Sequence, residues 1–190
     1  MIEEQLRYVF NQFDHNRKYK SFKELASGHI NDTYLIKTTE KPYFVLQRIN
    51  QGVFKDVPGL IENKVAISRH IQEKMKDASN KKKERGVLKF VRAKDGAAYY
   101  QGKEGNYWNL TYFIDKSVTH ETVKSKEIAY EGGKLMGKFL TLISDFDAKK
   151  LVEVIPKFHD MSFRYGQFEN ALSVASRERL AASEDYIKTI

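Results

Sequence analysis

The chain has 190 residues, of which 41% are hydrophobic and 13% aromatic, so it is long and apolar enough to fold around a core. It contains no cysteine, which excludes disulfide bonds, thiolate metal sites and cysteine nucleophiles and favours a reducing compartment. The 33 basic and 25 acidic residues give a formal charge of +8, which favours anionic partners. No apolar segment approaches the length needed to cross a bilayer, so we expect a cytoplasmic protein without a membrane partner.

The first predicted elements are a helix and three strands. Apolar residues spaced by three and four predict a short helix over residues 2–13. Apolar and β-branched runs then predict strands at Phe22–Ala26, Thr33–Thr38 and Tyr43–Ile49, with turn residues between them. We therefore expect an antiparallel meander.

A second helix and two or three further strands are expected next. Pro58 stands where a helix can begin without losing a backbone hydrogen bond, and helical spacing continues to about Lys76. After a basic loop, strands are predicted at Val87–Ala93 and Ala97–Gln101 around a hairpin turn. A third apolar run covers Tyr107–Ile114.

The remainder of the chain is predicted to be helical. A linker at Asp115–Thr119 precedes an apolar helical stripe in which Gly133 and Gly137 would allow a close helix neighbour. A final helix is predicted from about Phe168 to Ile187.

This order of elements is that of the small lobe of protein-kinase-like enzymes. The expected fold class is α+β. Residues 1–115 are expected to form a nucleotide-binding lobe with a leading helix, an antiparallel five-stranded sheet and a second helix. Residues 116–190 are expected to form a linker and the first helices of a helical large lobe.

The turn between the first two predicted strands is the first candidate for binding phosphate. It holds Ser27, Gly28, His29 and Asn31, and Thr33 follows at the start of the next strand. Glycine lets the backbone approach a ligand, and short polar side chains can donate hydrogen bonds to phosphate oxygens. An ordinary hairpin turn explains the glycine and the asparagine equally well.

The third strand and the following helix supply a candidate cation and its partner. Alternation places Leu46 and Arg48 on one face, which combines an apolar contact for adenine with a phosphate-binding guanidinium. Glu62, in the first turn of the helix, would pair with Arg48 as the strand lysine and helix glutamate pair in kinases. An exposed strand arginine and a glutamate that complements the helix dipole are the alternatives.

The extended segment between the two predicted lobes is the candidate adenine site. Its main-chain groups at Tyr112, Phe113 and Ile114 would hydrogen-bond the adenine edge. The alternative is an ordinary core strand.

Taken together, these segments resemble the aminoglycoside phosphotransferase and choline kinase superfamily, and most closely its N-acetylhexosamine 1-kinase branch. The resemblance runs over nearly the whole chain. The residues that carry it are Gly28–Leu35, Phe44–Asn50, Val53–Asp56, Leu60–Asn63, Gly105–Trp108, and Gly137–Phe139 through Phe158–Asp160.

The resemblance implies a bilobal kinase that transfers the γ-phosphate of ATP, with Mg²⁺, to a small hydroxyl acceptor such as an N-acetylhexosamine-like sugar. It assigns the phosphates to Ser27, Gly28, Asn31, Thr33 and Arg48, the orientation of Arg48 to Glu62, the adenine to the main chain at Tyr112 and Ile114, and an acceptor contact to His29.

The residues that would perform phosphoryl transfer are not found. The reaction needs a carboxylate at the acceptor hydroxyl and Asn and Asp ligands for Mg²⁺, which in this superfamily come from a His-Gly/Asn-Asp motif and a later Asp. His159 and Asp160 are followed by Tyr165 where the Asn is required, and Asp145–Asp147 precedes them, the reverse of the required order. We therefore expect a truncated chain that binds ATP, has no turnover alone and lacks the Mg²⁺ ligands.

Two alternatives stay open. The charge and the interleaved aromatics Tyr99, Tyr100, Tyr107 and Trp108 are compatible with a basic nucleic-acid-binding module, although these aromatics fit strand packing equally well. A noncatalytic nucleotide-binding protein that keeps only the small lobe is the other. We favour a nucleotide over nucleic acid as the partner.

Overall fold

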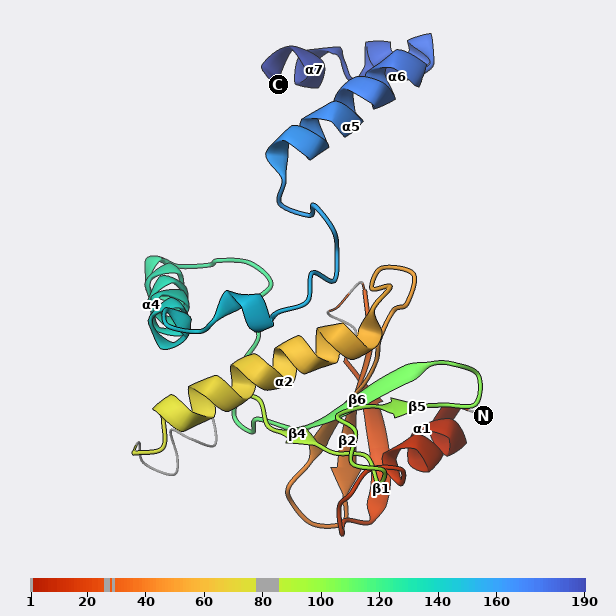
Figure 1. The fold of residues 1–190 in the computed structure, drawn as a ribbon, viewed down its shortest axis with the longest axis vertical. Helices are drawn as coiled ribbons and strands as arrows, with labels where there is room; N and C mark the ends of the chain where they lie inside the picture. The colour runs from red at the N-terminus through yellow and green to blue at the C-terminus, as the bar shows by residue number, and fades with distance from the viewer. Residues whose placement is uncertain (1, 26–27, 29, 78–85) are drawn as a thin grey trace. The chain divides into compact units, whose positions relative to one another are not determined.

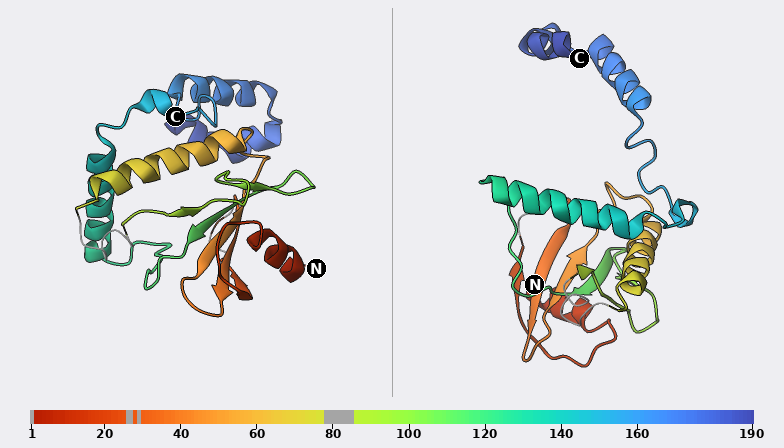
Figure 2. Two further views of the ribbon diagram at one scale, coloured as in Figure 1. Left: turned by 60° about the horizontal axis from the view of Figure 1, so that its bottom comes forward. Right: turned by 90° about the vertical axis from the view of Figure 1, so that its left-hand side faces the viewer.

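The computed structural model divides the chain into two compact units, residues 1–154 and 155–190. It describes residues 2–25, 28, 30–77 and 86–190. The first unit is α+β, with an open antiparallel sheet of six strands and several helices, and the second unit is helical (Figures 1 and 2). The α+β class is therefore confirmed.

The sheet has six strands rather than the five predicted, because the third apolar run forms a strand of its own. The strands are β1 (Tyr19–Glu24), β2 (Asp32–Thr38), β3 (Phe44–Arg48), β4 (Phe90–Val91), β5 (Tyr100–Gln101) and β6 (Tyr107–Tyr112). Their order is β1-β2-β3-β6-β4, with β5 also paired to β6, and all pairs are antiparallel. The predicted meander of the first three strands is present.

Helices flank the sheet in the first unit and make up the second. They are α1 (Ile2–Phe10), α2 (Val57–Lys74), α4 (Lys126–Ile143), the short 3₁₀ helix η1 (Ala148–Lys150), α5 (Met161–Val174), α6 (Arg177–Ala182) and α7 (Glu184–Thr189). The start of α2 agrees with the prediction from Pro58, and the Asp56 carboxylate caps it by accepting a 2.9 Å hydrogen bond from the Gly59 N–H.

The prediction of one final helix from Phe168 to Ile187 is wrong. The second unit has three helices in this part of the chain, and Ser176 separates the first two of them. Its hydroxyl accepts a hydrogen bond from the Arg179 N–H, which starts α6 as a new helix.

Different helices pack on the two sides of the sheet, α1 on one side and α2 on the other. Even-numbered residues of β2, β3 and β6 face α1, and with it they form the largest core cluster, which includes Leu6, Phe10, Tyr34, Ile36, Phe44, Leu46, Trp108 and Leu110. A second cluster of Ile49, Val57 and Ile61 forms between the opposite face and α2. Successive side chains of a strand point to opposite faces, so odd-numbered residues of the same strands face α2.

Contacts between α2 and the end of α4 complete the first unit. Leu142 and Ile143 pack near Ile71 on α2, and the Asp145 carboxylate pairs with Lys74 and His70. A Cβ on Gly133 or Gly137 would meet nothing within 4 Å, so the structure shows no close neighbour at these glycines among the residues it describes. None of the helices in the described ranges is both long and apolar enough to cross a bilayer.

Candidate functional site

The turn between β1 and β2 is the first part of the predicted site. Ser27 and His29 lie outside the described residues, whereas Gly28 is exposed. Among the described residues, a Cβ on Gly28 would meet the Asn31 carbonyl oxygen at 3.9 Å, an ordinary van der Waals distance. The described residues around Gly28 therefore leave room for a side chain at this position.

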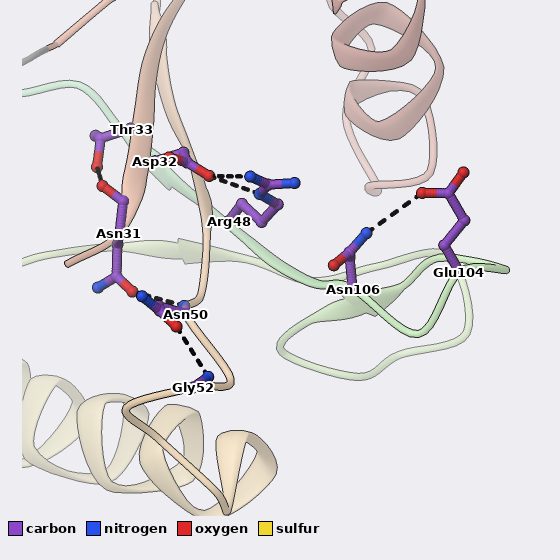
Figure 3. A network of polar contacts seen from close by, with 8 residues as sticks. All are labelled: Asn31, Asp32, Thr33, Arg48, Asn50, Gly52, Glu104 and Asn106. Atoms are coloured by element: carbon purple, nitrogen blue, oxygen red, sulfur yellow. Dashed lines mark hydrogen bonds and ion pairs between the residues drawn. The ribbon is translucent and has the colours of Figure 1, made fainter.

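Asparagine side chains fix the end of this turn to the connection between β3 and α2 (Figure 3). The Asn31 side-chain oxygen accepts a 2.9 Å hydrogen bond from the Asn50 N–H, and the Asn50 side-chain oxygen accepts one of 2.8 Å from the Gly52 N–H. A Cβ on Gly52 would lie 2.9 Å from that Asn50 oxygen, so glycine allows the second bond to form. Asn50 and Gly52 thus hold Asn31, which directly precedes β2, against the connection to α2, a role that sequence reasoning did not give them.

Arg48 pairs with Asp32 and not with Glu62, which corrects the predicted pairing. The two residues are direct cross-strand neighbours, and the Arg48 Nε and Nη2 atoms lie 2.6 and 2.5 Å from the Asp32 Oδ2 atom (Figure 3). Arg48 follows the even-numbered alternation toward the α1 side, whereas Glu62 belongs to α2, which covers the other side, and is exposed. Strand alternation therefore separates the two side chains.

The predicted adenine contacts are largely engaged within the protein. Leu46 has no exposed surface, because it lies in the core cluster beneath α1. The Tyr112 N–H donates to the Lys89 carbonyl at 3.0 Å, and the Phe113 N–H donates to the Tyr43 carbonyl at 2.9 Å. The Ile114 carbonyl accepts a 2.8 Å hydrogen bond from the Ser117 hydroxyl.

A row of polar side chains lies on the α2 side of the sheet, and sequence reasoning assigned a role only to its first member. Thr33, Gln47 and Asn109 are direct cross-strand neighbours on β2, β3 and β6, and we call these three residues the polar row. The Gln47 amide donates to the Thr33 hydroxyl at 3.1 Å, and the Lys64 ammonium on α2 donates to the Gln47 side-chain oxygen at 3.4 Å. Residues far apart in sequence thus meet between the sheet and one helix.

Two groups at the polar row are poorly satisfied. Burial lowers the pKa of the Lys64 ammonium below its ordinary value, because desolvation disfavours the charged form. The Asn109 side chain is buried, at 2% exposed, and its Nδ2 atom has no hydrogen-bond partner among the described residues. Both groups are donors, so the site is suited to a ligand that accepts hydrogen bonds and carries negative charge.

The acidic residues that imitate catalytic motifs have structural partners. Asp145 pairs with Lys74 and His70, Asp147 accepts a hydrogen bond from the Lys149 N–H, and Asp160 caps α5 through the Phe163 N–H. Within the residues that the structure describes, no group of three or more His, Asp or Glu side chains could hold a metal ion.

The aromatics that suggested nucleic-acid stacking pack into the protein. Trp108 is 1% exposed and belongs to the core beneath α1. Tyr99 and Tyr107 pack edge-to-face with ring centres 5.4 Å apart, and both contact the cluster beneath α2. Tyr100 packs against the α1 cluster. These rings do not form an open stacking platform.

No protein-family model matches the chain. The candidate site combines an exposed glycine at the β1–β2 turn, whose following residue Asn31 is bound to Asn50, with a partly buried polar row on the α2 side of the same sheet. Lys64 at this row makes no ion pair with any residue that the structure describes.

Proposed function

We propose that the chain is the nucleotide-binding part of a kinase that transfers the γ-phosphate of ATP to a small hydroxyl acceptor, such as an N-acetylhexosamine-like sugar. The order of its elements supports this proposal: a three-stranded meander, then α2, then returning strands, then an extended segment that leads to a helix. An open antiparallel sheet with this order is compatible with the small lobe of a kinase.

The observation that carries the proposal is the Gly28 turn. Its glycine is exposed, and a Cβ there would make no close contact with any residue that the structure describes. A ligand that approaches the backbone gives a reason for glycine at such a position, and peptide N–H groups in a turn are suited to phosphate oxygens. The hydrogen bond between Asn31 and Asn50 would hold this turn in place while the phosphates bind.

The residues of this chain would bind and orient the nucleotide. The Asp32 carboxylate already accepts hydrogen bonds from two guanidinium nitrogens of Arg48. Arg48 would therefore contact a phosphate through its remaining N–H donors. A bound Mg²⁺ would neutralise charge on the phosphates. The described residues contain no group of three or more His, Asp or Glu side chains that could hold a metal ion. Binding is therefore the step to test with this chain.

The proposal can be tested by thermal unfolding of the full chain with ATP, GTP, adenosine and a single-stranded oligonucleotide. A ligand that binds only the folded state raises the unfolding temperature, so ATP should raise it, adenosine should raise it less, and GTP should differ from ATP. If only the oligonucleotide stabilises the chain, and this effect disappears steeply as salt is added, the nucleic-acid-binding alternative is right and the proposal is wrong.

A further inference from the structure

Lys64, on α2, is a partly buried cation whose contacts with the described residues are weak. Its ammonium lies 3.4 Å from a neutral amide oxygen of Gln47 and 5.8 Å from the centre of the Phe90 ring, and it makes no ion pair with any residue that the structure describes. Lys74, on the same helix, instead pairs with Asp145. A partly desolvated cation without an anion is costly, so such a residue in a polar setting points to an anionic ligand.

Asn109 supplies an independent observation at the same place. It lies directly across from Gln47 in the register of β3 and β6, so the two side chains share the face that looks toward α2. Asn109 is only 2% exposed, and its Nδ2 donor has no hydrogen-bond partner among the described residues. Orphaned buried donors are rare in folded proteins and call for an explanation.

The polar row also lies near the turn that carries the proposed function. Thr33 is the second residue of β2 and lies five positions after Gly28 in the sequence. Its hydroxyl accepts from Gln47, which in turn accepts from Lys64, so a chain of hydrogen bonds runs from β2 to α2. The end of the sheet that holds the turn therefore also holds the uncompensated charge.

We propose that Lys64 and Asn109 bind a phosphate-type oxyanion on the α2 face of the sheet, with Gln47 and Thr33 positioning the lysine. A phosphate offers both the negative charge that Lys64 lacks and the acceptor oxygens that Asn109 lacks. The identification of this oxyanion as part of a nucleotide rests on the proposed function, whereas the oxyanion site itself does not. Lys64, rather than Arg48, is then the main phosphate-binding cation.

The test compares binding of inorganic tripolyphosphate and of ATP to the full chain and to two variants. Lys64→Met removes the charge from the site, and Lys37→Met removes the same charge from an exposed position on the same face of β2. We expect Lys64→Met to weaken the binding of both ligands about tenfold or more, because it removes a charge-assisted contact. Lys37→Met should change either affinity by less than about threefold, the size of a distant surface charge effect.

A second measurement needs no variant. The side-chain NH₂ resonances of Asn109 should shift on addition of tripolyphosphate, because the orphaned donor gains an acceptor. Binding that is equal in Lys64→Met and the unmodified chain, or Asn109 resonances that stay fixed at saturation, overturns the oxyanion site while leaving ATP binding intact. If instead tripolyphosphate binding depends on Lys64 and ATP binds no more tightly than tripolyphosphate, the oxyanion site stands and the nucleotide function fails.

Discussion

Replacing Lys64 with methionine should stabilise the protein in the absence of ligand. Methionine keeps most of the apolar stem, so the packing between α2 and the sheet changes little. The contacts that are lost are weak: the hydrogen bond to Gln47 is long, at 3.4 Å, and the Phe90 ring is 5.8 Å away, which together contribute about 1 kcal/mol.

The gain should exceed this loss. Burying an unsatisfied polar group costs about 1–3 kcal/mol and a charged group more, so removing the Lys64 charge should leave a net stabilisation of about 1 kcal/mol. For a chain of this size that corresponds to a rise of about 2–4 °C in unfolding temperature. Thermal or urea unfolding at neutral pH measures it, with Lys37→Met as the control that should stay within about 0.5 kcal/mol of the unmodified chain.

The lowered pKa of Lys64 also predicts how the stability difference between Lys64→Met and the unmodified chain changes with pH. The folded-state pKa of Lys64 is lowered, so the energetic cost of its charge is fully present below that pKa and disappears as the pH rises toward the ordinary lysine value. The stability difference between Lys64→Met and the unmodified chain should therefore be largest near neutral pH and shrink in alkaline solution. A variant that is less stable than the unmodified chain, or a difference that grows with pH, would refute the reasoning.

Two further predictions concern other polar contacts. A double-mutant cycle on Arg48 and Asp32 should give a coupling energy of about 0.2–1 kcal/mol, because both side chains are partly exposed. A cycle on Arg48 and Glu62 should give additive effects on the free energy of unfolding. A measurable coupling between Arg48 and Glu62 would contradict their placement on opposite sides of the sheet. Burial and the nearby Glu3 carboxylate raise the pKa of Tyr19 to about 12, so the stability of the protein should fall as the pH rises from the ordinary tyrosine value of 10.0 toward 12. Ultraviolet titration should show one tyrosine that ionises at a higher pH than the others. Tyr19→Phe should remove both the late ionisation and this loss of stability.

Local signals predicted some elements well and others poorly. The proline and the capping aspartate at residues 56–58 mark the start of α2, since both act within one helical turn. The prediction that the first strand begins at Phe22 is wrong by three residues, because β1 begins at Tyr19. Tyr19–Ser21 is a largely polar stretch of an edge strand, and its place in the sheet depends on pairing with β2. Edge strands need no apolar alternation, so their limits depend on partners that local sequence does not reveal.

The candidate site illustrates the same limit. Alternation correctly predicts that Leu46 and Arg48 share a face, but local sequence does not indicate which helix covers that face. Gln47 and Asn109 are 62 positions apart and meet only through the register of β3 and β6. The long-range pairing of strands thus brings together a polar row that local sequence does not predict.

Calorimetric titration of ATP into the full chain and into Gly28→Ala tests the central claim most directly. The described residues leave room for the added methyl group, so the variant should unfold at the same or a slightly higher temperature. We predict saturable ATP binding by the unmodified chain and affinity about tenfold weaker in Gly28→Ala, since the methyl group would stand between the backbone and the phosphates. No saturable binding, or equal affinities in the two proteins, would contradict the account.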